Sequence, residues 1–216
     1  MNPTIHNQLK NHFPAASLFA IVARVKVEAS TSELRDRLIQ LSSNLISNYT
    51  LENFREQENI KVSREAFKIF GRDPNRYMVS SEALYKRILQ KKDLYYINNV
   101  IEINNFLSLK SGLSFGSYNL DNIKGEINYR IGSSGETLDG IGKGKIPLEC
   151  LPVLCDEISP FGSPTSDSRR AMIDLPCENV LMIAYCFQAN YNFTEIIEDA
   201  KSLLSKYASA TEVKIL

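Results

Sequence analysis

The N-terminal half of the chain carries its apolar residues mainly at helical spacing. Residues 18–27 are the exception, because alternating apolar and basic positions near their end predict a strand with one buried face. A serine followed three residues later by a glutamate, Ser30 and Glu33, is typical of a capping box and predicts that a helix begins there. The leucines that follow recur every three or four residues and predict its buried stripe: Leu34, Leu38, Leu41 and Leu45.

Further amphipathic stretches predict more helices before residue 112. The helical pattern covers residues 50–70, 80–90 and 99–111. Gly71 and the turn residues after it end the first of these stretches. Gly112 is expected to end the last one in a left-handed cap, because glycine adopts that conformation without steric cost.

Strand and turn signals dominate the second half. Nine of the ten glycines lie between residues 112 and 162, with short alternating apolar runs between them. The expected elements are strands at 126–131, around 146, at 153–154 and at 180–187, and a closing helix at 192–207. This order predicts the α+β class, with a mainly helical N-terminal half and a mainly antiparallel C-terminal sheet packed by helices. No internal repeat or linker is found, so residues 1–216 are expected to form a single domain.

Composition and charge narrow the classes of function. The chain is 44% hydrophobic and 23% charged, which is typical of a globular protein and excludes a disordered or collagen-like chain. The 25 basic residues balance the 25 acidic ones, so any contact with RNA must be local. The longest apolar stretch, residues 15–23, is about half the length that crosses a bilayer, and the first residues lack a secretory pattern. We expect no membrane partner and a cytoplasmic location.

Common catalytic and metal-binding motifs are missing from the sequence. The two histidines, His6 and His12, lie far from the four cysteines and from every serine-rich loop, so we expect no zinc site, no catalytic triad and no cofactor. The stretch 140–145 holds three glycines and two lysines, but it lacks the spacing of a P-loop. A glycine-rich hairpin is the favoured interpretation, although its backbone amides and lysines could contact a phosphate.

An ordered set of motifs lies between Tyr77 and Asp174. Asn-Asn-Val at 98–100 precedes an Asn104–Asn105 step on the same predicted helix, and a glycine-containing loop at 114–121 follows. This order resembles the editing module of the β subunit of bacterial phenylalanyl-tRNA synthetase, and the chain is similar to free-standing copies of that module. The resemblance implies a pocket for the aminoacyl end of tRNA, where a wrongly attached tyrosine is hydrolysed.

The resemblance also implies roles for individual residues. Asn104 and Asn105 match a Thr-Asn step that offers amide groups to the substrate. Gly116 falls where the synthetases carry a histidine, and Gly162 matches a glycine on the pocket floor. The loop 163–169 is shorter than in the synthetases and lacks the glutamate that reads the tyrosine hydroxyl. Without that histidine and glutamate, we expect deacylation to be slow or absent.

Three sets of candidate site residues follow. The expected catalytic residues are Asn105, Thr165 and Asp167. The expected substrate-binding residues are Asn104, Gly116, Gly162, Ser163, Ser168 and Arg169. The expected RNA-binding residues are Arg76, Lys86, Arg87, Lys91 and Lys92.

Each set has a structural alternative, and two functions remain open. The cations are also typical of a solvated helix face, Asp167 and Arg169 of a loop-stabilising pair, and Asn98 and Asn99 of helix caps. The first function is deacylation of mischarged aminoacyl-tRNA in trans, in which backbone amides hold a water and the vicinal ribose hydroxyl assists. The second is non-catalytic binding of tRNA or of a small amino-acid-like ligand.

Overall fold

The computed structural model describes residues 2–216 and confirms the α+β class. Its helices are α1 (Asn7–His12), α2 (Ser32–Asn48), α3 (Leu51–Arg55), α4 (Glu58–Ile69), α5 (Ser80–Leu89), α6 (Asn99–Ser111) and α7 (Thr194–Ala208). Its strands are β1 (Thr4–Ile5), β2 (Ser17–Arg24), β3 (Ser114–Asn119), β4 (Asn128–Ile131), β5 (Thr137–Gly140), β6 (Gly144–Pro147), β7 (Pro152–Cys155), β8 (Pro160–Gly162), β9 (Asn179–Cys186) and β10 (Thr211–Ile215). None of the helices in this part of the chain is long and apolar enough to cross a membrane.

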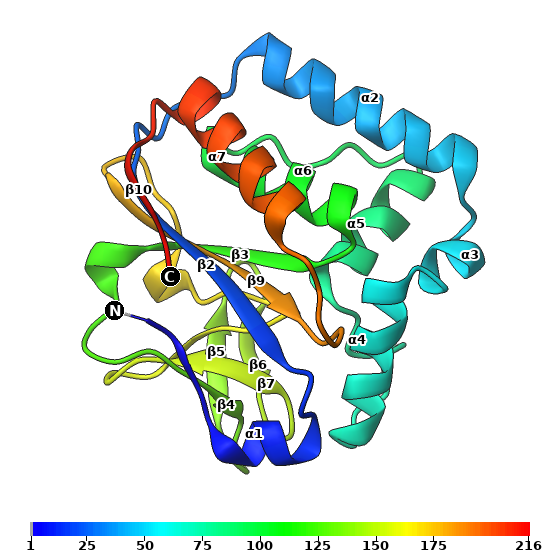
Figure 1. Ribbon diagram of the computed structural model, residues 1–216, viewed down its shortest axis with the longest axis vertical. Coiled ribbons are helices and arrows are strands. Elements are labelled where there is room, and N and C mark those ends of the chain that lie inside the picture. The colour runs from blue at the N-terminus through cyan, green and yellow to red at the C-terminus, as the bar shows by residue number, and fades with distance from the viewer. Residues whose placement is uncertain (1) are drawn as a thin grey trace.

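A four-stranded antiparallel sheet, in the order β10-β2-β9-β3, forms the centre of the fold. Helices α6 and α7 cover one of its faces, and α2 lies outside them (Figure 1). On the other side lie a second sheet, β1-β4-β7-β8, and the β5–β6 hairpin. Because both faces of the central sheet are covered, the side chains of β9 and β3 are almost all buried.

The first long helix begins one residue later than the capping-box pattern predicts. The cap of α2 is Thr31, whose hydroxyl accepts the Leu34 N–H at 3.3 Å. Glu33 does not complete the box, because its carboxylate bonds instead to Lys206 and, at 3.0 Å, to the hydroxyl of Tyr207 on α7. The leucine stripe is confirmed, with Leu34 fully buried against α6.

The predicted helical region 50–70 consists of two helices, α3 and α4, with a turn between them. Both are held to α5 through Glu82, whose side chain is 0% exposed. Its carboxylate accepts from Arg55 Nε at 2.6 Å and from Arg64 Nη1 at 2.9 Å. The Tyr85 ring on α5 also stacks on Phe54 of α3 at a centroid distance of 3.6 Å. These contacts fix the position of α5, which forms a wall of the site described below.

Helix α6 is positioned by polar groups at both ends. The Asn98 side chain accepts the Ile101 N–H at 2.9 Å, so it is a helix cap. Asn99 Nδ2 donates to the carbonyls of Lys26 and Tyr207, each at 2.8 Å, and so ties α6 to the segment after β2 and to the end of α7. Gly112 has φ +73° and ends the helix, as predicted.

Several sequence predictions are corrected by the sheets. The loop expected at 114–121 is a buried strand, β3, over residues 114–119, because it pairs along its whole length with the apolar strand β9. The strand predicted at 18–27 ends at Arg24, and the short elements β1, α1 and β10 were not predicted. The glycine-rich stretch is a hairpin, with Gly140 opposite Gly144, as favoured from its sequence.

Candidate functional site

A cavity of about 410 Å³ lies between α5, the start of α6, β3, the β5–β6 hairpin and the loop after β8. Much of its wall is apolar: Ala83, Leu84, Ile97, Ile101, Phe115 and Ile141. Its polar lining includes five of the residues that sequence reasoning selected: Arg87, Asn104, Asn105, Thr165 and Asp167. An apolar chamber with a few convergent polar groups is typical of a small-ligand site.

The two adjacent asparagines of α6 have different surroundings. Asn104 Nδ2 donates to the Phe115 carbonyl at 3.2 Å, and its Oδ1 accepts from Ser117 Oγ at 2.9 Å. Its amide therefore joins α6 to β3. The Asn105 side chain is 8% exposed, lines the cavity and forms no hydrogen bond within residues 2–216. Asn105 is thus the amide that can bond to a ligand.

Asp167 is the acidic group of the cavity, and two buried tyrosines hold one of its oxygens. Tyr118 Oη donates to Asp167 Oδ1 at 2.6 Å, and Tyr185 Oη lies 2.6 Å from Tyr118 Oη. Since each hydroxyl has one proton, Tyr185 donates to Tyr118, which in turn donates to the carboxylate. Loss of solvation raises the pKa of Asp167 to about 7, although the bond from Tyr118 and the charge of Lys143 both lower it. A carboxyl that titrates near neutral pH therefore faces the cavity.

The loop that carries Asp167 is organised by serine hydroxyls. Ser163 Oγ accepts the N–H groups of Thr165 and Ser166 at 3.3 and 3.1 Å and lies 3.0 Å from Thr165 Oγ1. Ser168 Oγ accepts the Arg170 N–H at 3.0 Å and caps a short turn of 3₁₀ helix. Neither Ser163 nor Ser168 lines the cavity, so both shape the loop that presents Thr165 and Asp167 to it.

Gly116 and Gly162 lie on either side of the Tyr118 hydroxyl and outside the cavity lining. A Cβ atom on Gly116 would lie 2.0 Å from Tyr118 Oη, and one on Gly162 would lie 2.1 Å from the same atom. The space that a pocket-floor glycine leaves for a substrate is therefore filled by a tyrosine of the chain itself.

The predicted cations are not gathered at one place. Arg87 lines the cavity, whereas Lys91 and Lys92 line a separate groove of about 270 Å³ against α2. Arg76 lies over the ring of Tyr77 at 5.5 Å. Lys86 is exposed on α5.

The Asp167–Arg169 pair considered from the sequence does not form. Asp167 bonds to Tyr118, while the exposed Arg169 lies 3.9 Å from Asp139 on β5. Arg169 is therefore outside the cavity and available only to a ligand that extends beyond it.

Sequence reasoning missed several residues of the cavity or its support. Tyr118 falls in the expected loop and Tyr185 in an expected strand, and nothing in the sequence reveals that the Tyr118 hydroxyl bonds to Asp167 or that the Tyr185 hydroxyl bonds to Tyr118. Lys143 enters the cavity from the hairpin turn, and its Nζ donates to Ser166 Oγ at 3.1 Å. Tyr95 lines the cavity mouth from the segment between α5 and α6. Among these residues, only Lys143 could have been found from the sequence, because it lies in the glycine-rich stretch 140–145.

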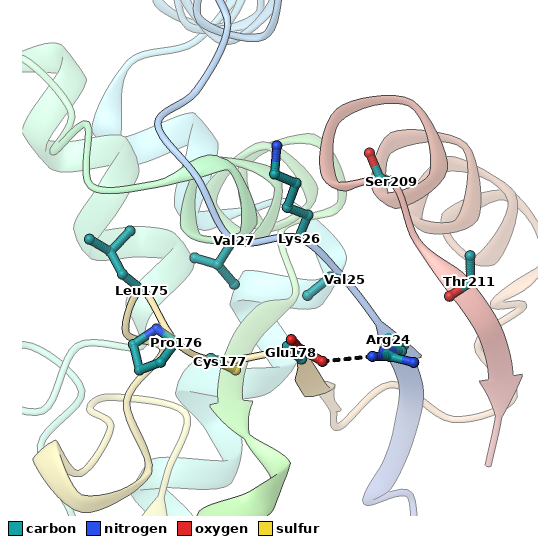
Figure 2. Close-up of a pocket in the computed structure, with 10 residues that line it drawn as sticks. All are labelled: Arg24, Val25, Lys26, Val27, Leu175, Pro176, Cys177, Glu178, Ser209 and Thr211. Carbon is teal, nitrogen blue, oxygen red and sulfur yellow. Dashed lines mark hydrogen bonds and ion pairs between the residues drawn. The ribbon is translucent and has the colours of Figure 1, made fainter.

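Another cavity, of about 500 Å³, lies between residues 24–27 and residues 175–178 (Figure 2). Its charged groups are already paired: Arg24 Nη2 lies 2.8 Å from Glu178 Oε2, and Lys26 Nζ lies 2.6 Å from Glu28 Oε2. The Arg24–Glu178 pair is typical. Both side chains are more than half exposed, and such pairs contribute little energy. None of the predicted site residues lines this cavity.

The cysteines and the metal-ligating residue types offer no further reactive centre. Burial raises the pKa of the Cys155 and Cys177 thiols to about 12 and also raises the pKa of Cys186, so these thiols stay protonated. Across residues 2–216, no three His, Cys, Asp or Glu side chains are placed to hold a metal ion.

A comparison of the sequence with known protein families assigns this chain to one of them. Residues 62–214 match the B3/4 domain family, the editing-type domain of the phenylalanyl-tRNA synthetase β subunit. The chain belongs to the B3/4 domain family, which confirms the resemblance drawn from its motifs.

Among solved structures, the chain matches an N-terminal fragment of the phenylalanyl-tRNA synthetase β subunit from Pyrococcus horikoshii. The match has 14% sequence identity and a TM-score of 0.49, and it covers 100% of this chain and 50% of that one. This chain therefore spans about half the length of that fragment. No curated protein matches the sequence.

Proposed function

We propose that this protein binds the aminoacylated 3′ end of tRNA in the Asp167 cavity and hydrolyses the ester in trans. The observation that carries the proposal is geometric: the Asp167 carboxyl and the Asn105 amide, which has no side-chain partner within residues 2–216, line the same largely apolar chamber. Burial raises the pKa of Asp167 to about 7. A general base is most effective when its pKa lies near the working pH. Asp167 supplies the proton-accepting group that the family's histidine would have supplied at Gly116.

Three polar groups of the cavity, Asp167, Asn105 and Thr165, have a task in this reaction. A water attacks the ester carbonyl carbon while Asp167 Oδ2 accepts its proton. Asn105 donates an N–H to the carbonyl oxygen as negative charge develops there. The bond to the ribose oxygen then breaks, that oxygen takes the proton from Asp167, and the free amino acid leaves. Thr165 orients the water, and the vicinal ribose hydroxyl donates to the leaving oxygen.

The apolar wall limits the kind of aminoacyl group that the cavity accepts. Its side chains come from α5, α6, β3 and the hairpin, and they offer no partner for a charged substrate side chain. Burial of an unpaired charge is costly, so an uncharged aminoacyl group is favoured. Asn105 and Thr165 can bond to one uncharged polar group on the aminoacyl side chain. A translation-related activity of this kind also agrees with the expected cytoplasmic location.

Release of free amino acid from a panel of mischarged tRNAs tests the proposal. Asp167→Asn, which keeps the shape of the side chain, is expected to slow release by about a hundred- to ten-thousand-fold. Asp139→Asn removes an exposed carboxylate on β5, outside the cavity lining, and is the matched control. A tRNA that lacks the vicinal ribose hydroxyl is expected to resist hydrolysis. Retention of tRNA without release of any amino acid would instead establish the non-catalytic binding module.

We also propose that Arg76 and the cations of the α5 region, Lys86, Arg87, Lys91 and Lys92, contact the tRNA backbone. Changing Lys91 and Lys92 to glutamate is expected to reduce tRNA retention, and retention by the unchanged protein is expected to fall steeply as salt rises, because phosphate neutralisation releases counterions. Both lysines are exposed, so thermal stability is expected to stay the same. The control is the same double change at Lys61 and Lys68 on α4. Equal retention by both double variants at low salt would exclude this surface.

A further inference from the structure

Tyr95 is unusually exposed for a large aromatic residue. It lies on the segment between α5 and α6, at the mouth of the Asp167 cavity, and 61% of it is in contact with solvent. Ile97, on the same mouth, is also 61% exposed. A ring and an aliphatic side chain that remain in water beside a cavity mark a surface where a ligand packs.

The ring of Tyr95 is held in a fixed orientation by Arg87. The centre of the guanidinium lies 3.9 Å from the ring centroid, and Arg87 Nη1 donates to Tyr95 Oη at 3.0 Å. Arg87 is itself fixed, because its Nε donates to the Asp93 carbonyl at 2.7 Å. With the guanidinium on one face, the large exposed area leaves the other face open. The site thus presents a preorganised flat surface with a cation behind it.

A second cation lines the same cavity from the hairpin turn. Lys143 is exposed, and its Nζ is within hydrogen-bond distance of Ser166 Oγ. An aromatic face with cations close by matches the chemistry of a nucleotide, which joins a flat base to a phosphate anion. An apolar peptide would gain nothing from the two cations.

We propose that Tyr95, held by Arg87, is the stacking surface for the terminal nucleobase of the RNA, with Lys143 contacting its phosphate. The inference rests on the proposed function, because the terminal base reaches Tyr95 only when the 3′ end of the RNA lies at the cavity. Stacking of this kind accepts any base, so Tyr95 contributes affinity for the 3′ end rather than discrimination among tRNAs.

The test uses an RNA hairpin with a CCA 3′ end, not aminoacylated, in which 2-aminopurine replaces the terminal adenine. Stacking quenches the fluorescence of 2-aminopurine, and anisotropy of a second label gives the affinity. The variants are Tyr95→Ala, Tyr95→Phe and Tyr96→Ala. Tyr96 is the matched control, because it also lies over an arginine, Arg35 at 5.1 Å, but lines the groove against α2 instead of the cavity.

We expect the 2-aminopurine fluorescence to be quenched by the unchanged protein, by Tyr95→Phe and by Tyr96→Ala. Tyr95→Ala is expected to lose the quenching and to bind the hairpin about tenfold or more weakly. Quenching that survives in Tyr95→Ala, or that is lost equally in Tyr95→Phe or Tyr96→Ala, would overturn the proposal. So would the absence of quenching with the unchanged protein.

The probe carries no ester, so this result is independent of hydrolysis. If no mischarged tRNA is hydrolysed but the quenching pattern holds, deacylation fails and the stacking surface stands. If esters are hydrolysed and Tyr95→Ala keeps the full kcat/KM, the stacking surface fails and deacylation stands.

Discussion

The change Asp167→Asn is expected to stabilise the protein increasingly as pH rises from about 4 to 8. The carboxyl ionises near 3.8 in the unfolded chain, whereas in the folded chain loss of solvation raises its pKa to about 7. Between these values the folded protein holds a proton that the unfolded chain has released, so stability falls as pH rises. Asparagine cannot ionise, and the variant lacks this loss.

The size of the effect follows from the two pKa values. The difference between 3.8 and about 7 corresponds to about 4 kcal/mol of unfolding free energy. The unchanged protein loses all of this stability above pH 7 and none of it below pH 4. Near pH 4 the two proteins are expected to be almost equally stable, because the neutral acid and the amide have similar shapes and both accept from Tyr118.

Urea unfolding at several pH values between 4 and 8 measures this difference. With an m value of about 2 kcal/mol per M, the midpoints of the two proteins are expected to separate by about 2 M at pH 8. Asp139→Asn is the control and is expected to show no such trend. A constant separation across the pH range, or a less stable Asp167→Asn protein at pH 8, would refute the account of Asp167 as a desolvated acid.

Three further changes probe the surroundings of this acid and the helices that hold the site. Tyr118→Phe removes the hydrogen bond that lowers the pKa of Asp167, so the pH at which deacylation reaches half its maximum is expected to rise; an unchanged pH–rate profile would contradict this. Gly162→Ala places a Cβ 2.1 Å from Tyr118 Oη and is expected to cost about 1–3 kcal/mol, measured by urea unfolding. Glu82→Gln removes the buried partner of two arginines and is expected to cost about 3–5 kcal/mol in the same assay, with little dependence on salt; a loss below 1 kcal/mol would contradict this estimate.

The long helices could be predicted because their apolar residues repeat at helical spacing and their ends carry local signals. Helices α2 and α6 show this, since the leucine stripe and Gly112 are both found where expected. Strand β3 could not be predicted in this way. Its residues Ser114, Gly116 and Asn119 favour turns, and the strand forms because it pairs with β9 and packs against α6. The conformation of residues 114–119 therefore depends on contacts with segments that are distant in the sequence.

The candidate site could be predicted only where a motif named the residues. Thr165 and Asp167 meet Asn105 at one cavity although about 60 positions separate them in the chain, and the family resemblance had connected them. The state of Asp167 could not be predicted, because it depends on how deeply the loop lies and on which hydroxyl it meets. The expectation of slow or absent chemistry rested on the missing histidine and took no account of a carboxyl that titrates near pH 7.

The surroundings of Tyr118 show why a residue that aligns with a family's site position need not have the same role. The family resemblance implies that Gly116 and Gly162 are pocket positions, yet a Cβ atom on either would lie 2.0 or 2.1 Å from the Tyr118 hydroxyl. The Tyr118 hydroxyl fills the space that both glycines leave and donates to Asp167 at 2.6 Å, so it orients the acid of the cavity without lining the cavity itself. A Cβ atom at either glycine would displace this hydroxyl, so both glycines are needed for its hydrogen bond to Asp167.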